Sequence, residues 1–212
     1  MRYNCNKWYE MSDALTAVLA TANPDKVAEI KEILQDTGLY LRDRPVGLGD
    51  IDETGETIEQ NAILKARAVG GYSGLPAVAD DTGLEVDSLG GRPGVYSSRY
   101  AGPNASYADN VNALLEELAR VGSLDVADRG ARFVTVACLW IPGDEVILAR
   151  GTVEGYVAAK ATGDGWGYDP VFVPLEGDGR TFAEMSSSEK NAISHRGRAF
   201  RELAGMIRGQ SN

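Results

Sequence analysis

The sequence is poor in the residues that build many metal and disulfide sites. Its 212 residues include one histidine, His195, and two cysteines, Cys5 and Cys138. Two cysteines cannot supply a disulfide framework or a cysteine-rich zinc site. A single histidine excludes a centre built from several histidines, and it leaves at most one imidazole to act as acid, base or ligand.

Positive charge and long apolar runs are also scarce. The 21 Lys and Arg residues stand against 31 Asp and Glu, a net charge of −10, which disfavours non-specific binding to nucleic acid or to an anionic membrane. No run reaches the roughly 18 apolar residues of a membrane span, and residues 1–10 lack the apolar stretch of a signal peptide. We therefore expect a cytoplasmic protein with an N-terminal tail over residues 1–13 and one domain over residues 14–209.

Short apolar runs alternate with helical periodicity, which predicts an α/β fold. Strands are expected at residues 14–20, 76–79, 83–86 and 171–173, and a hairpin of two long strands at 132–140 and 145–157. Helices are expected after four N-cap residues, Asn23, Thr57, Ser106 and Ser194. Glycines would end the first two helices, at Gly38 and at Gly70-Gly71. Residues 89–102 and 163–170 are predicted to be loops.

A strand-to-helix junction supplies the first candidate site. It consists of Thr21, Ala22, Asn23, Pro24, Asp25 and Lys26. Free N–H groups at a helix N-terminus attract phosphate. Lys26 is electrostatically misplaced in a first helical turn unless an anion lies there. A plain capped helix with a solvated lysine explains the same residues.

Adjacent carboxylates supply the second candidate site. Asp80 and Asp81 repel each other, and a divalent cation or a raised pKa would relieve that repulsion. Side chains alternate along a strand, so the two carboxylates should point in different directions unless the chain turns there. A solvated turn at the end of a strand is the alternative. Asp52 and Glu53, before the helix that carries Lys65, suit the dipole of that helix and would also suit Mg²⁺ near Asp81.

Two further segments suggest a binding site for a planar, acceptor-rich molecule. Trp166 and Tyr168 lie among glycines, where they could form a stacking platform for a base or simply a surface turn. Residues 190–208 carry five basic residues and one acidic residue, so this segment is positively charged in a chain whose net charge is negative. Arg196 opposes the dipole at the start of the last predicted helix, which favours an anionic or acceptor-rich partner over a solvated cationic face.

Taken in order, these segments resemble the inosine/xanthosine triphosphate pyrophosphatases, the Ham1-like family. The segments that carry the resemblance are residues 21–26, 53–55, 61–66, 79–84, 89–100, 167–170 and 194–197. The resemblance implies an elongated, two-lobed α/β fold with a long mixed sheet flanked by helices and an active cleft between the lobes. It also implies Mg²⁺-dependent hydrolysis of deaminated purine nucleoside triphosphates (ITP, dITP and XTP) to monophosphate and pyrophosphate, by a homodimer.

The resemblance further implies roles for individual residues. Asp81 would accept a proton and bind Mg²⁺ together with Asp52, and Asp80 and Lys65 would assist the chemistry. Substrate would be held by residues of the junction and by later segments, namely Thr21, Ala22, Asn23, Pro24, Asp25, Lys26, Thr82, Trp166, Gly167, Tyr168, Asp169, Lys190, His195 and Arg196. A donor on His195 or Arg196 would meet O6 of the purine, which makes His195 a base-reading residue rather than the catalytic base.

Three residues depart from the family pattern. Trp166 stands in place of the usual Phe, Gln60 in place of Glu, and Asp52 in place of a longer Glu. Two other functions remain open: a Maf-like hydrolase of modified pyrimidine triphosphates, and a nucleotide-binding module without catalysis. The segment 194–196 favours the purine enzyme over the first, and the Asp80-Asp81 pair favours an enzyme over the second.

Overall fold

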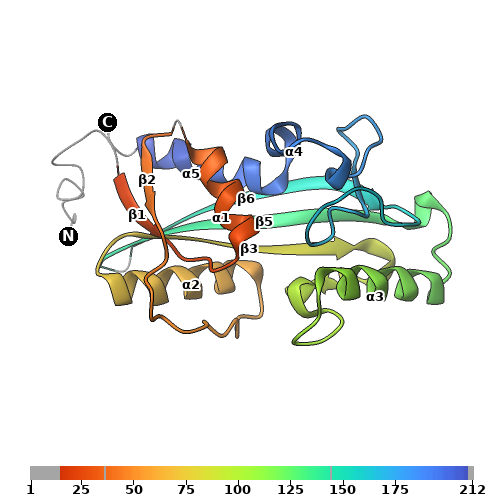
Figure 1. Cartoon of the computed structure of the whole chain (residues 1–212), viewed down its shortest axis with the longest axis horizontal. Coiled ribbons are helices and arrows are strands. Elements are labelled where there is room, and N and C mark those ends of the chain that lie inside the picture. Colours follow the sequence, from red (N-terminus) through yellow and green to blue (C-terminus); the bar gives the residue numbers. More distant parts are fainter. Residues whose placement is uncertain (1–14, 36, 144, 210–212) are drawn as a thin grey trace.

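The computed structural model describes residues 15–35, 37–143 and 145–209, and it is an elongated α/β molecule built on a mixed sheet (Figure 1). The predicted tail at residues 1–13 lies outside the described residues. The described strands are β1 (Leu15–Leu19), β2 (Leu39–Arg42), β3 (Ala77–Val86), β4 (Pro93–Gly94), β5 (Gly130–Ile141), β6 (Glu145–Val157) and β7 (Phe172–Pro174). They are ordered β2-β1-β3-β5-β6-β7, with β4 also on β3. β1 is parallel to β2 and β3, and the other pairings are antiparallel.

The helices are α1 (Pro24–Leu34), α2 (Ile58–Ser73), α3 (Tyr107–Arg120), α4 (Ser187–Ile193) and α5 (His195–Gly209). Short 3₁₀ turns lie at Asp87–Leu89, Ser97–Arg99, Val126–Asp128 and Phe182–Glu184. The four predicted N-caps are confirmed: three accept a hydrogen bond from the first turn of their helix, and Ser194 accepts one from the N–H of Gly197. The long hairpin is confirmed as β5 and β6. No described helix is long and apolar enough to cross a membrane.

Three predicted boundaries are wrong. Helix α1 ends at Leu34, with Gln35 as its C-cap, and so stops before Gly38. Helix α2 does not end at Gly70-Gly71 but continues to Ser73, where Gly74 adopts a left-handed conformation with φ of 70°. Gly70 lies against the ring of Trp140, and a Cβ there would clash with that ring. The glycine therefore allows close packing of helix on strand instead of ending the helix. Residues 76–79 and 83–86 are not two strands but parts of one continuous strand, β3.

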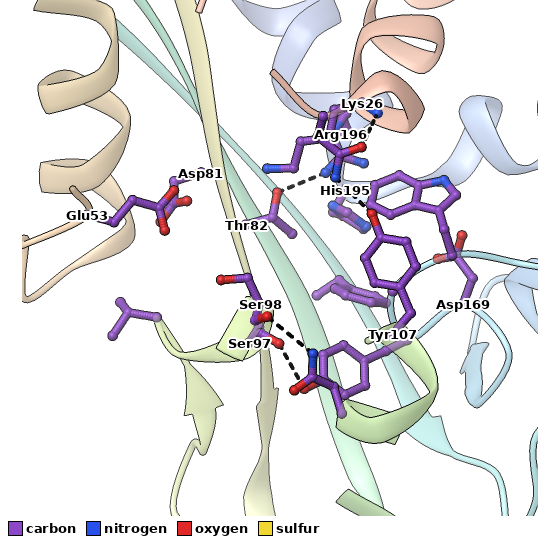
Figure 2. A pocket seen from close by; sticks show the side chains of 17 residues that line it. Lys26, Glu53, Asp81, Thr82, Ser97, Ser98, Tyr107, Asp169, His195 and Arg196 are labelled. Atoms are coloured by element: carbon purple, nitrogen blue, oxygen red, sulfur yellow. Dashed lines mark hydrogen bonds between the residues drawn. The ribbon is translucent and has the colours of Figure 1, made fainter. Parts of the chain in front are cut away.

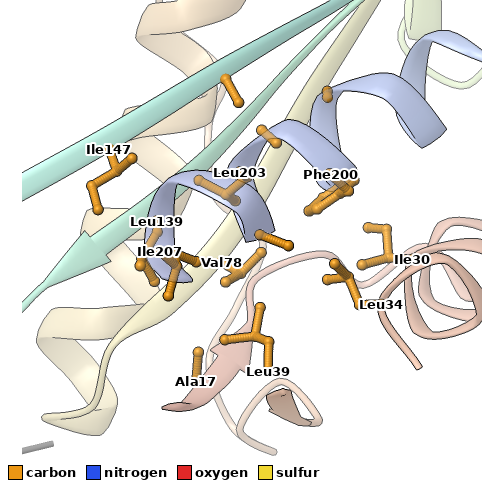
Figure 3. Packing of buried hydrophobic residues seen from close by; sticks show 14 of the residues in the cluster. Ala17, Ile30, Leu34, Leu39, Val78, Leu139, Ile147, Phe200, Leu203 and Ile207 are labelled. Atoms are coloured by element: carbon orange, nitrogen blue, oxygen red, sulfur yellow. The ribbon is translucent and has the colours of Figure 1, made fainter. Parts of the chain in front are cut away.

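Three apolar clusters hold the layers together. Helices α1 and α5 pack on one face of the sheet through residues such as Ile30, Leu34 and Phe200 (Figure 3). Helix α2 packs through its small residues on strands β1, β3 and β5. The third cluster, at the other end of the long strands, joins α3 to β3, β5, β6 and the segment around Phe172. Strands β3, β5 and β6 thus run through the length of the molecule (Figure 1).

One edge of β3 changes neighbour along its length. β1 pairs with Ala77 and Val78, and β4 pairs with Leu84 and Glu85. Between them, residues 80–82 have no strand on that side in the described chain. A break between neighbouring strands is a common place for a binding crevice in α/β sheets. The two adjacent aspartates lie at this break.

Candidate active site

A pocket opens at this break, and residues from both ends of the chain line it. Ten of the predicted site residues line it: Asn23, Lys26, Asp81, Thr82, Trp166, Gly167, Tyr168, Asp169, His195 and Arg196. The others, which do not line it, are Thr21, Ala22, Pro24, Asp25, Asp52, Lys65, Asp80 and Lys190. Figure 2 shows Glu53 and Asp81 on one side of β3, and Lys26, His195 and Arg196 on the other. A ligand that touches both groups must cross the uncovered edge of β3.

Asp81 is the centre of the first group. Lys65 Nζ lies 2.7 Å from Asp81 Oδ1 and 2.7 Å from Glu53 Oε1. Asn61 donates to Asp81 Oδ2 at 3.4 Å and accepts from the N–H of Gly55 at 2.8 Å, which ties the strand to the turn after Glu53. Burial raises the pKa of Asp81 above its ordinary value, and Lys65 opposes that rise only in part. The ionised form of Asp81 is therefore less favoured than that of an exposed aspartate.

The structure does not bring Asp52 to this group. The side chain of Asp52 is exposed, whereas Glu53 faces Lys65 and Asp81. Arg99 fixes this orientation, because its guanidinium donates to Glu53 Oε2 and to the Glu53 carbonyl, each at 3.3 Å. The acid that can share a cation with Asp81 is thus one residue later than the sequence analysis predicted. Gln60 lies outside the group, and its side chain accepts from the N–H of Glu56 at 2.7 Å.

Asp80 points to the opposite face of the sheet, as strand alternation predicts. Its Oδ2 lies 3.0 Å from Lys26 Nζ and 3.3 Å from Arg196 Nε. Burial alone would raise the pKa of Asp80, but the two cations hold it well below its ordinary value. Asp80 therefore stays ionised and behaves as a counter-ion rather than as an acid or a base. Burial lowers the pKa of Lys26, and Asp80 counters this.

The ion pairs continue from Arg196 to the segment around Trp166. Glu29 on α1 pairs with Arg196 and, at 2.8 Å, with Lys190, which also pairs with Asp169 at 2.6 Å. Burial would raise the pKa of Glu29, but Arg196 and Lys190 hold it below its ordinary value. Burial raises the pKa of Asp169 despite Lys190.

Across both groups, five basic side chains face five carboxylates, namely Lys26, Lys65, Arg99, Lys190 and Arg196 against Glu29, Glu53, Asp80, Asp81 and Asp169. The charges around the pocket are thus balanced.

The helix N-terminus predicted to attract phosphate is already capped. Asn23 Oδ1 accepts from the N–H groups of Asp25 and Lys26 at 2.9 and 3.4 Å. Asn23 Nδ2 donates to the hydroxyl of Tyr107 at 2.9 Å, and that hydroxyl donates to Asp25 Oδ2 at 3.2 Å. Tyr107, the first residue of α3, thereby links the two ends of the molecule across the pocket.

Trp166 and Tyr168 have different environments. Lys190 Nζ and the Arg196 guanidinium carbon lie 4.9 and 5.1 Å from the centre of the Trp166 ring. The Tyr107 ring lies 6.1 Å from the Trp166 ring, at an angle of 46°. Half-buried Trp166 can thus still offer a ring face to a ligand. Tyr168 is buried in the third cluster, and its hydroxyl donates to the Ser97 carbonyl at 3.0 Å, so it supports the pocket wall.

His195 is held firmly at the base of the pocket. It is 2% exposed, and its ring stacks on Phe133 with the centroids 4.4 Å apart. Its Nδ1 lies 2.7 Å from Thr135 Oγ1 on β5. Burial and the nearby cations Arg196 and Lys190 hold the pKa of His195 well below its ordinary value, so the ring is neutral at physiological pH.

Several residues of the site were missed by the sequence analysis. Glu29 lies three residues after Lys26, a spacing that places the two on one helical face and could have revealed it. Tyr107 directly follows a predicted N-cap. Thr135 and Phe133 gave no signal, because only the packing of strands and helices brings them to His195. Asn61 lies in a segment that carries the family resemblance, but its bond to Asp81 could not be read from the sequence.

Comparison with known proteins places the chain among nucleotide hydrolases. Residues 17–206 match the model of the Ham1 family. A protein of Bacillus subtilis named dITP/XTP pyrophosphatase is 44% identical over 194 residues, which cover 90% of this chain and 96% of that protein. A dITP/XTP pyrophosphatase of Streptomyces avermitilis is 45% identical over 196 residues, with the same coverage. The solved structure of a HAM1 protein from Coxiella burnetii has a TM-score of 0.81 and 42% identity, and the match covers 91% of this chain and 98% of that one.

Proposed function

Because this chain belongs to the Ham1 family, we propose that it hydrolyses ITP, dITP and XTP to the nucleoside monophosphate and pyrophosphate, and so removes deaminated purines from the nucleotide pool. The observation that carries the proposal is the division of the pocket by the edge of β3. A carboxylate group built on Asp81 lies on one side, and an aromatic, histidine-containing wall lies on the other. A nucleotide can place its phosphates at the first and its base at the second.

Asp81 is the proposed proton acceptor. A water molecule that attacks the anhydride between the α- and β-phosphates must lose a proton, and the Asp81 carboxylate lines the pocket where it can receive one. Lys65, bonded to Asp81 Oδ1, orients that carboxylate and can contact a phosphate oxygen. Lys26 extends toward the same edge from the other face.

The donor set fits a divalent cation. Glu53 Oε1 and Asp81 Oδ1 each lie 2.7 Å from Lys65 Nζ, so the two carboxylates are held close together around a positive charge. The described residues hold no group of three or more acidic, histidine or cysteine side chains arranged for a metal. Two carboxylates completed by phosphate oxygens and water are a usual Mg²⁺ environment. When bound, Mg²⁺ would supply the positive charge that the balanced pocket lacks for a triphosphate.

The base would lie against Trp166, beside His195 and Arg196. The guanidinium of Arg196 has five N–H donors, and the described chain uses one each for Glu29, Asp80 and Thr82. The remaining donors can meet O6 of a 6-oxopurine, where adenine carries an amino group. A site that hydrogen-bonds one base edge can discriminate strongly against the other.

Release of pyrophosphate from a panel of nucleotides tests this function. We expect turnover of ITP, dITP and XTP in Mg²⁺, little turnover of ATP, and none in EDTA. Asp81→Asn should lower the rate by about a hundredfold or more, because general-base catalysis contributes factors of that size. Equal rates on ITP and ATP would contradict the base preference. Preference for methylated pyrimidine nucleotides would instead indicate the Maf-like activity, and tight ITP binding without turnover would indicate a binding module.

We also propose, from the resemblance to the family, that the enzyme is a homodimer and acts on the cytoplasmic nucleotide pool. Light scattering on the full chain measures the first of these directly. A molar mass close to the 22.7 kDa of one chain would contradict it.

A further inference from the structure

A line of hydroxyl groups connects Asp80 to His195 beneath the pocket. Thr82 Oγ1 lies 3.3 Å from Asp80 Oδ2 and 2.6 Å from Thr135 Oγ1. Thr135 Oγ1 lies 2.7 Å from His195 Nδ1. Arg196 NH2 donates to Thr82 Oγ1 at 3.1 Å. Thr135 is fully buried, so no water competes for its hydroxyl.

Only one arrangement of hydrogens makes each of these four contacts a hydrogen bond. Asp80 Oδ2 already accepts from Lys26 and Arg196 and so has no hydrogen to give, which makes Thr82 the donor to it. The hydroxyl of Thr82 has then used its one hydrogen, and Thr135 must donate to Thr82. Thr135 has in turn used its hydrogen, so His195 must donate from Nδ1. If Thr82 donated to Thr135 and Thr135 to His195, no hydrogen would be left between Thr82 and Asp80.

Because the His195 ring is neutral, it carries a single hydrogen, and a hydrogen on Nδ1 leaves Nε2 with a free lone pair. Nε2 makes no hydrogen bond within the described residues, and the side chain lines the pocket. Stacking on Phe133 keeps the ring from turning. The acceptor atom is therefore available to a ligand.

We propose that Thr82 and Thr135 fix His195 in the tautomer with hydrogen on Nδ1, so that Nε2 reads the base as a hydrogen-bond acceptor. This rests on the proposed function, and it assigns His195 an acceptor where the sequence analysis expected an N–H donor. The matching donor on a 6-oxopurine is N1–H, next to the O6 that Arg196 can meet. Adenine has an amino group and a bare N1 at these places, so both contacts fail. Guanine carries the same two groups as hypoxanthine, and this pair separates 6-oxopurines from adenine only.

The tautomer can be observed without any substrate. His195 is the only histidine in the chain, so ¹⁵N-labelled histidine in untagged protein gives one set of ring signals. Long-range ¹H–¹⁵N spectra should show a protonated, pyrrole-type Nδ1 and an unprotonated, pyridine-type Nε2. The opposite assignment, or a doubly protonated ring at pH 7, would overturn the proposal whether or not the protein is active.

Two variants of Thr135 distinguish the effect of its hydroxyl group from the effect of its side-chain shape. Thr135→Val removes the hydroxyl at nearly constant volume, and Thr135→Ser keeps it. We expect the Thr135→Val protein to show a mixture of tautomers or the Nε2–H form. Its kcat/KM for ITP divided by its kcat/KM for ATP should fall by about tenfold, which corresponds to the loss of one hydrogen bond. Thr135→Ser should behave as the wild type in both measurements. An unchanged tautomer and ratio in Thr135→Val would contradict the positioning role.

A substrate analogue tests the base contact itself. The triphosphate of 1-deazainosine has C–H in place of N1–H, and its 6-oxo form carries the ring hydrogen on N3. It therefore removes the donor beside O6 without adding bulk. We expect its kcat/KM to fall by about tenfold or more relative to ITP, since the acceptor on His195 loses its partner. If ITP is hydrolysed and the analogue is equally good, the inference fails while the proposed function stands. If ITP is not hydrolysed at all, the proposed function fails, and the spectra still decide the tautomer.

Discussion

At the scale of single residues, Asp80 and Asp81 show how the backbone assigns different tasks to identical side chains. They are neighbours on β3, and strand alternation sends one carboxylate to each face of the sheet. Asp80 meets two cations and stays ionised, whereas Asp81 is buried beside one lysine and its pKa is raised. The chemistry of each is set by the face on which it lies.

The choice between Asp52 and Glu53 shows where sequence reasoning reaches its limit. Both acids precede the same capped helix, and nothing in their order says which one turns inward. The decision comes from Arg99, 46 positions away from Glu53, which binds both its side chain and its carbonyl. Contacts over such a separation in sequence cannot be read from local pattern.

Matched substitutions of these two acids test that assignment. Glu53→Gln should raise the Mg²⁺ concentration needed for half-maximal activity by about tenfold or more, because a carboxylate ligand becomes a neutral amide. Asp52→Asn should leave the Mg²⁺ dependence unchanged, since its side chain is exposed and remote from Asp81. Titration of activity with Mg²⁺ at saturating ITP measures both. The reverse result would restore Asp52 as the ligand.

At the scale of elements, the sequence predicted best what is determined locally. The helix N-caps depend on residues within one turn, and all four were found. The hairpin of β5 and β6 has a turn signal between two long apolar strands. The continuity of β3 was missed, because two charged residues inside an apolar strand look like its end. The two aspartates can be buried in a strand because cations from α1, α2 and α5 pair with their carboxylates. The short strand β2 and helix α4 were not predicted.

The place of α5 depends on one glycine in β6. A Cβ at Gly151 would lie 2.6 Å from the N atom of Ala199 and closer still to the His195 carbonyl. The missing side chain lets the first turn of α5 rest directly on the strand, which brings His195 to Thr135.

Gly151→Ala should therefore lower the free energy of unfolding by about 1–3 kcal/mol, the usual cost of overpacking, and should lower activity because α5 shifts. Gly205→Ala, in helix α5, is the control. No atom lies within 4 Å of a Cβ there, so it should stabilise the protein by about 0.5–1 kcal/mol. Urea unfolding measures both. Equal effects of the two changes would contradict the close packing described for Gly151.

At the scale of the whole molecule, buried ion pairs join parts of the chain that are far apart in sequence. Glu29 on α1 binds Lys190 on α4 and Arg196 on α5, and Arg196 reaches Asp80 in the sheet. These pairs connect the layers around the pocket. The stability of the fold should therefore depend on pH through carboxylates that are also part of the site.

Glu29 provides the test of this dependence. Its folded pKa is held below the ordinary value of 4.5, so its contribution to stability is fully present above pH 4.5 and is lost as the pH falls through the folded pKa. Glu29→Gln should lower the free energy of unfolding by about 3 kcal/mol at pH 7, as loss of one partner in a buried pair does. The difference from wild type should shrink near pH 3. Exposed Glu32→Gln is the control and should have little effect at either pH. A difference that is equal at both pH values would argue against the ion pairs.

The register of β3 against β5 has a consequence for how this gene can vary. Asp80 is opposite Ala137 and Asp81 is opposite Val136, so the position of each aspartate along the strand decides its face. Loss of one codon between residues 77 and 79 would move both aspartates by one place and exchange their faces. The counter-ion would enter the pocket and the proton acceptor would leave it, although no residue of the site had been replaced. The site should therefore tolerate substitutions in this stretch better than an insertion or a deletion there.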